Sequence, residues 1–132
     1  MDFQTALRAR LIADEAVAAI AAARVYWVER TKGSAYPAIT LQVISDPRSS
    51  HLKGFDGARS TRVQMDCWAT SYGAALQLAR AAIAALAGPA AILGKKFGNA
   101  LVEGQRDLSE PVADGSTIHR QSVDLIIWHV GD

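Results

Sequence analysis

Histidine and cysteine, the side chains that most often bind metals or act as nucleophiles, are few in this chain and widely spaced. The histidines are His51, His119 and His129, and the single cysteine is Cys67. No two of these residues stand at the close spacing typical of zinc sites. His119 and His129 lie in one predicted strand, roughly 30 Å apart if it is extended, so they cannot share a metal ion within one chain. We therefore expect no metal site and no bound cofactor.

Cys67 is the main candidate for a catalytic nucleophile, but its position favours a structural role. It shares one side of an alternating segment with Val63 and Met65, where a small buried hydrophobic residue is expected. One cysteine also cannot form an internal disulfide, which favours a reducing compartment. A small Cys67-dependent hydrolase remains a remote alternative, and we expect no catalytic site.

Asp66 and Asp124 are the carboxylates of most interest because each lies within a predicted strand among apolar neighbours. Each can pair with Arg62, with Arg120 or with an arginine of another subunit. Each can equally belong to a solvated sheet face, where ion pairs contribute little. The sequence leaves these two interpretations open.

A phosphate-binding loop is not indicated. Residues 88–96 resemble one superficially, but five residues separate Gly88 from Gly94 where the motif has four. Lys96 also occupies the position of the hydroxyl residue that would bind magnesium. We interpret this stretch as a helix end followed by a basic turn.

The composition indicates a single domain spanning residues 1–132. Hydrophobic residues make up 50% of the chain and charged residues 20%, which is typical of a globular protein. The 14 Lys and Arg are nearly balanced by 13 Asp and Glu, for a net charge of +1. This balance excludes the strong basic excess of a broad nucleic-acid-binding surface. We expect no sequence-specific nucleic-acid binding, and neither a signal peptide nor a membrane span is indicated.

Hydrophobic periodicity predicts an α+β fold. Apolar residues at helical spacing predict one bent helix or two short ones over residues 2–22, and a second main helix from Ser71 to Gly88. Alternating or β-rich segments predict strands over residues 24–30, 37–45, 62–69, 100–107 and 118–128. We expect the first two strands to form a hairpin and the last to lie inside the sheet. The predicted fold is a mostly antiparallel sheet of about four to five strands with two main helices packed on it.

Two features are candidate interaction surfaces. Residues 46–60 form a polar, glycine-rich connection that exceeds the ~2–5 residues of an ordinary hairpin, and such a loop either orders against a neighbour or is mobile. Trp68 and Trp128 lie beside polar positions of their strands, where they either cover the sheet or anchor a subunit contact. The predicted interface comprises Arg48, His51, Lys53, Phe55, Asp56, Arg59, Trp68 and Trp128.

Four segments, by their order and spacing, carry a family resemblance. They are residues 6–11 (ALRARL), 36–42 (YPAITLQ), 63–69 (VQMDCWA) and 118–128 (IHRQSVDLIIW). Together they resemble the tail-completion proteins of long-tailed bacteriophages and gene transfer agents, also called tail terminator or head-to-tail joining proteins. The resemblance runs essentially from end to end.

The resemblance implies a non-enzymatic virion protein in the neck region of a phage-like tail, assembled in the host cytoplasm. Such subunits form a ring, typically of about six copies, at the head-proximal end of the tail tube. The implied partners are other copies of the chain, the tail tube protein and the head-tail connector or stopper protein. Residues 48–59 match a region that is long and variable in the family, which makes them a candidate contact. Another neck or head-closure component of the same particle is the alternative.

Overall fold

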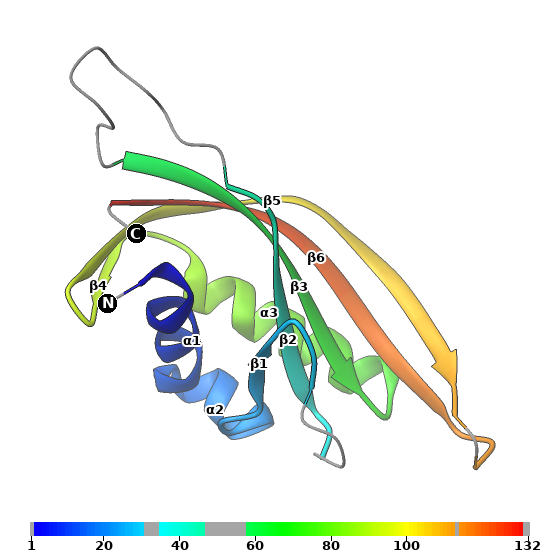
Figure 1. The fold of residues 1–132 in the computed structure, drawn as a ribbon. Helices are drawn as coiled ribbons and strands as arrows, with labels where there is room; N and C mark the ends of the chain where they lie inside the picture. The colour runs from blue at the N-terminus through cyan, green and yellow to red at the C-terminus, as the bar shows by residue number, and fades with distance from the viewer. Residues whose placement is uncertain (1, 31–34, 47–57, 113, 131–132) are drawn as a thin grey trace.

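Three helices and six strands make up the part of the chain that the computed structural model describes, residues 2–30, 35–46, 58–112 and 114–130. In chain order they are α1 (Phe3–Ala13), α2 (Glu15–Ala21), β1 (Val25–Trp27), β2 (Ala38–Ser45), β3 (Ala58–Ala69), α3 (Tyr72–Leu86), β4 (Ala90–Ile92), β5 (Lys95–Pro111) and β6 (Thr117–Val130). The strands form one sheet in the order β1-β2-β3-β6-β5-β4. The sheet arches over the helices, which lie on its concave side (Figure 1).

The predicted α+β class and the mostly antiparallel sheet are confirmed, but the number of elements is larger than predicted. The extra strand is β4, a short segment after α3 that pairs with the start of β5. Residues 2–22 form two helices because Asp14 both ends α1 and caps α2, where its carboxylate accepts a hydrogen bond from the Val17 N–H at 3.1 Å. Asp2 caps α1 in the same way, accepting from the Thr5 N–H at 2.7 Å.

The predicted hairpin between the first two strands is wrong. β1 pairs with β2 in parallel, with Val25 opposite Ile39. Val28 adopts a φ of 71°, a value that β-branched residues rarely take, so the chain leaves the sheet after three residues of β1. The predicted turn at residues 31–34 lies outside the described residues.

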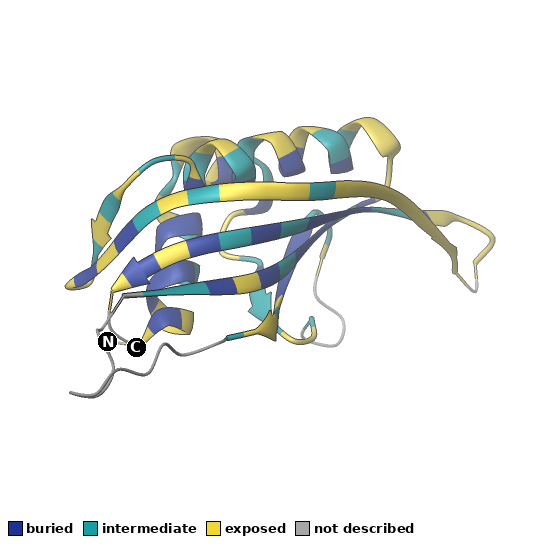
Figure 2. Ribbon diagram, turned by 90° about the horizontal axis from the view of Figure 1, so that it is seen from above, coloured by how far each residue is buried: buried dark blue, intermediate teal, exposed yellow. Residues whose placement is uncertain are grey.

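The antiparallel pair β3–β6 forms the centre of the sheet. Met65 lies opposite Val123, and Val63 lies opposite Leu125. Alternate residues of both strands point toward the helices and are buried, as the sequence predicts. The buried apolar side chains at the centre of this face are Val63, Met65, Cys67, Val123, Leu125 and Ile127. Figure 2 shows buried residues recurring along these two strands, whereas β5 is mostly exposed along its length.

The helix α3 covers the central strands with a stripe of small and apolar residues. Ser71 caps it by accepting a hydrogen bond from the Ala74 N–H at 3.2 Å, and it ends just before Gly88, whose φ is 78°. Helical spacing from Leu76 predicts an apolar stripe of Leu76, Ala79, Ile83 and Leu86, but only Ala79 and Leu86 are buried, because the helix turns its alanine-rich side to the sheet. The buried residues are Ala75, Leu78, Ala79, Ala82 and Leu86.

The burial of Leu125 in the core predicts that truncating it lowers the free energy of unfolding far more than truncating the exposed Leu93. Leu125 is 1% exposed and Leu93 is 53% exposed. We expect Leu125→Ala to lower the free energy of unfolding by about 2–5 kcal/mol, because it removes buried methyl groups and leaves a cavity. Leu93→Ala should change it by no more than about 0.5 kcal/mol. Urea denaturation followed by circular dichroism measures both, and equal effects would contradict the assigned core.

Candidate interaction surface

The sheet face opposite the helices, here called the open face, carries mostly polar side chains. Because successive side chains of a strand point to opposite faces, the residues between the buried ones lie on this side. In register they place Gln64 opposite Asp124 and Trp68 opposite Arg120. The residues of the open face used below are Thr40, Arg62, Gln64, Asp66, Trp68, Leu101, Glu103, Arg106, Glu110, Arg120, Ser122, Asp124, Ile126 and Trp128.

A closed polar cluster surrounds Trp68 at one end of the open face. The indole Nε1 of Trp68 donates to Thr40 Oγ1 at 2.9 Å, and the guanidinium carbon of Arg120 lies 4.7 Å from the indole ring centroid. Arg120 also contacts Asp66 Oδ2 at 3.6 Å and Glu110 Oε1 at 3.3 Å. Trp68 is therefore half-buried beneath an arginine and covers the sheet, which is the structural alternative stated for it above.

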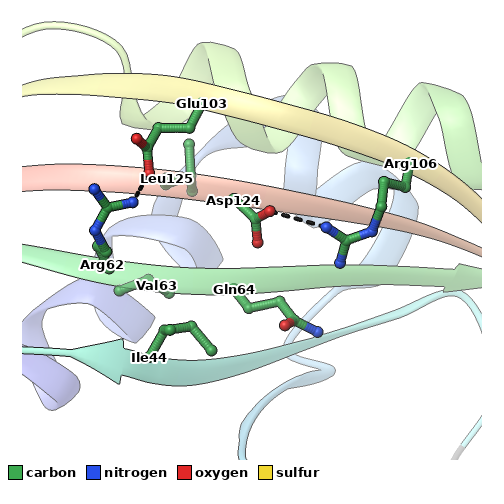
Figure 3. A pocket seen from close by; sticks show the side chains of 8 residues that line it. All are labelled: Ile44, Arg62, Val63, Gln64, Glu103, Arg106, Asp124 and Leu125. Atoms are coloured by element: carbon green, nitrogen blue, oxygen red, sulfur yellow. Dashed lines mark hydrogen bonds and ion pairs between the residues drawn. The ribbon is translucent and has the colours of Figure 1, made fainter.

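A shallow pocket of about 220 Å³ lies in the middle of the open face (Figure 3). Arg62 forms an ion pair with Glu103 across its rim, and Arg106 contacts Asp124 Oδ2 at 3.0 Å. The residues that line it are Ile44, Arg62, Val63, Gln64, Glu103, Arg106, Asp124 and Leu125. Both arginines face a carboxylate, so the pocket offers no uncompensated charge to an ionic ligand.

The carboxylate partners differ in part from the predicted ones. The predicted pairing of Asp66 with Arg120 is confirmed at 3.6 Å. Asp124 instead pairs with Arg106 of β5, which the sequence analysis missed. The sequence could not show that Arg106 lies next to Asp124, because two irregularities in the β5–β6 register determine which β5 residues face Asp124.

Trp128 lies at the opposite end of the open face and is 53% exposed, next to Val130 at 51%. A shallow, mostly apolar pocket of about 230 Å³ opens beside them. It is lined by Arg59, Lys96, Phe97, Gly98, Trp128, His129 and Val130. Gly98 permits this packing, because a Cβ there would lie 3.2 Å from Trp128 Cβ. An exposed indole beside an apolar hollow has the character of an interface anchor.

The structure brings together two of the predicted interface residues and separates a third. Arg59 and Trp128 line the same pocket. Trp128 lies opposite Ser60 of β3. Trp68 is eight residues further along β3 than Ser60, which corresponds to roughly 27 Å in a strand. The other predicted residues, Arg48, His51, Lys53, Phe55 and Asp56, lie outside the described part of the chain.

A partly buried polar network joins Asp46, the residue after β2, to β3 and β6 beneath the Trp128 end of the sheet. Asp46 accepts from Arg59 Nη2 at 3.1 Å and from the Thr61 hydroxyl at 3.0 Å. Since that hydroxyl has one hydrogen, its 2.7 Å contact with His129 Nε2 requires the histidine to donate. The His129 ring also stacks on Phe3 of α1 at 4.2 Å. His129 therefore acts as a structural link between the sheet and the first helix.

Cys67 is fully buried, as predicted. Burial, with a smaller contribution from the neighbouring Asp66 charge, raises the pKa of its thiol far above its usual value. The thiolate required for nucleophilic attack is therefore suppressed. Among the described residues, no group of three His, Cys, Asp or Glu side chains could hold a metal ion. No helix in the described ranges is long and apolar enough to cross a membrane.

The chain matches a known protein family over almost its whole length. The family model described as "Tail completion protein gp17" matches residues 5–129. Such proteins are structural virion proteins of phage tails and not enzymes. The chain belongs to the tail completion family.

Among solved structures, a chain of a virion particle shares the fold over nearly the whole length. It is a chain in the "Virion of native gene transfer agent (GTA) particle", with a TM-score of 0.73 and 18% sequence identity. The match covers 98% of this chain and 95% of that chain. No curated protein matches.

The buried thiol predicts resistance to alkylation. Iodoacetamide at neutral pH should leave Cys67 unmodified in the native protein, because the side chain is inaccessible and its raised pKa keeps it protonated. The same reagent should modify it fully in urea. Intact mass spectrometry measures both states, and rapid native modification would reopen the nucleophile hypothesis.

The cluster around Trp68 predicts a stability cost when its arginine is removed. We expect Arg120→Ala to lower the free energy of unfolding by about 1–3 kcal/mol, because Asp66, 8% exposed, loses its cationic partner. Arg80→Ala, at an exposed position of α3, is the matched control and should be nearly neutral. Urea denaturation compares the two, and an Arg120 effect no larger than that of Arg80 would show that the cluster contributes little.

Proposed function

We propose that this chain completes the head-proximal end of a phage-type tail tube as a ring of about six copies and joins the tail to the head. Residues 1–132 act as one domain in this ring. The partners are other copies of the chain, the tail tube protein and the connector or stopper protein of the head. The complex is assembled in the host cytoplasm and remains in the neck of the virion.

The observation that carries this proposal is the family match over residues 5–129. The similar chain in the gene transfer agent virion agrees with it at the level of fold. Both comparisons cover nearly the whole chain. We therefore look for the assembly contacts on the surfaces of the described sheet and helices.

The charges of the open face support contact with proteins over recognition of nucleic acid. Its arginines face carboxylates of the same chain: Arg62 with Glu103, Arg106 with Asp124, and Arg120 with Asp66 and Glu110. Binding to a phosphate backbone requires cations that release counterions on contact, and paired arginines provide little of this. We therefore propose that the open face does not hold the phosphate backbone of DNA passing through the ring.

The apolar end of the open face supplies the contact with an adjoining component. Trp128 and Val130 are about half exposed beside an apolar hollow. Large exposed aromatic residues next to a pocket are typical energetic centres of protein interfaces. Residues 58 and 59 of the predicted loop belong to β3, and they pair with this end of β6.

Complementation of particle production tests the proposal. Removal of the gene for this chain should leave heads and tails that do not join, and the wild-type chain should restore joined particles. Trp128→Ala should restore far fewer, because it removes the exposed anchor, whereas Leu93→Ala, equally exposed at 53%, should restore as many as wild type. Electron microscopy of negatively stained particles counts them.

Two outcomes would overturn parts of the proposal. Normal joined particles in the absence of the chain would exclude a tail-completion role. Copurification of the chain with isolated heads but not with isolated tails would assign it to head closure, the alternative within the same particle.

A further inference from the structure

The outer edge of β5 is a long stretch of strand without a neighbour. β6 pairs with β5 on the inner side from Lys96 to Pro111. On the outer side, β4 pairs with Lys95–Phe97, and no other described strand continues beyond it. Residues 98–111 therefore present a row of main-chain N–H and C=O groups to the outside, which is a template for the addition of another strand.

This edge is held in place by a polar network on the helix side of the sheet. Gln121, 1% exposed, accepts a hydrogen bond from Gln105 at 2.7 Å and donates to Asp107 at 2.5 Å. The hydroxyl of Tyr72, the first residue of α3, donates to Asp107 at 3.3 Å. The β5–β6 hairpin is thus fixed to the helix layer beyond the core, and a pre-organised edge loses little conformational entropy on binding.

The opposite margin of the sheet also has an uncovered stretch. β1 pairs with Ile39–Leu41 of β2 and then ends, so the outer side of residues 42–45 has no partner strand in the described ranges. Arg8 Nε donates a hydrogen bond to the Val25 carbonyl at 2.7 Å. This main-chain acceptor of β1 is therefore not available to an added strand. The free stretch of β2 is flanked by Val28 and Ile44, exposed at 72% and 52%.

Each margin carries a charged side chain that contacts no oppositely charged group among the described residues, and both margins expose apolar residues. Asp107 on the β5 margin contacts a hydroxyl and an amide, and no cationic side chain of the described residues. Arg24, which precedes β1 and lies level with the start of β2, donates to the main-chain carbonyls of Ile20 and Pro37 and contacts no carboxylate of the described residues. Exposed apolar residues line the β5 margin as well, namely Leu101, Val102, Leu108 and Val112.

We propose that the outer edge of β5 receives the β2 margin of a second copy of this chain, so that the sheets of neighbouring copies are continuous. Because two different edges meet, the contact is head-to-tail, and its repetition closes into a ring when the rotation between copies allows. The inference rests on the proposed function and names the surfaces that build its ring.

Disulfide trapping tests this contact. Cys67 remains in place, because it is buried and unreactive. Ile44→Cys combined with Leu101→Cys or with Leu108→Cys, in one chain, should give a ladder of covalent oligomers under mild oxidation, read on non-reducing gels. The control is Ile44→Cys with Leu93→Cys, since Leu93 is as exposed as Leu101, 53% against 57%, but lies outside the free edge. It should give no ladder.

The outcomes separate this inference from the proposed function. Rings seen by native mass spectrometry, without a ladder from either pair, would overturn the edge contact and leave the ring intact. A ladder stopping at dimers in the single variant Leu108→Cys would show that β5 meets β5. A chain that stays monomeric at all concentrations and on isolated tail tubes would count against the ring itself.

Charge placed on the edge provides an independent measurement. The double variant Leu101→Lys with Leu108→Lys should raise the concentration for half-maximal assembly at least about tenfold, because lysines on an edge strand oppose strand addition. Leu93→Lys should leave it unchanged. Circular dichroism verifies that each variant is folded, and unchanged assembly of a folded double variant would overturn the proposal.

Discussion

The antiparallel pairing of β3 with β6 is the constraint on which the rest of the structure depends. Its register sets Met65 opposite Val123 on the helix side and Gln64 opposite Asp124 on the other. A shift by one residue would exchange the two faces, placing the apolar set in water and the charges against α3. The alternation of apolar and polar residues in β3 and β6 therefore determines both the core and the polar open face. His129 reinforces this pairing by joining Thr61 of β3 to Phe3 of α1.

The regular parts of this fold were predictable from sequence, and the irregular parts were not. Alternation in β3 and β6 predicted their buried faces, and helical spacing over residues 2–22 predicted two short helices as one of two alternatives. The parallel pairing of β1 was not predictable, because it depends on a positive φ at Val28, where residue type gives no warning. The partner of Asp124 depends on irregular register in β5. Of the predicted interface, Arg59 and Trp128 lie together, whereas Trp68 is held within its own cluster.

Ion pairs within the chain neutralise most of the charge on the open face. The arginines of the open face contact carboxylates on neighbouring strands, so the sheet face is polar but nearly neutral. Affinity for partners then has to come from exposed apolar side chains and main-chain edges, which occur at Trp128 and along β5. A structural virion protein of the tail completion family requires surfaces of this kind, since its work is to hold other subunits in place.

The most direct test of the account is a cryo-electron microscopy map of the assembled particle at a resolution that shows side chains. The account predicts a ring of this chain between the tail tube and the head connector, with the β5 edge of each copy against the β2 margin of the next and Trp128 buried against an adjoining component. A map that places the chain elsewhere in the particle, or as isolated copies without contact between their sheets, would contradict it.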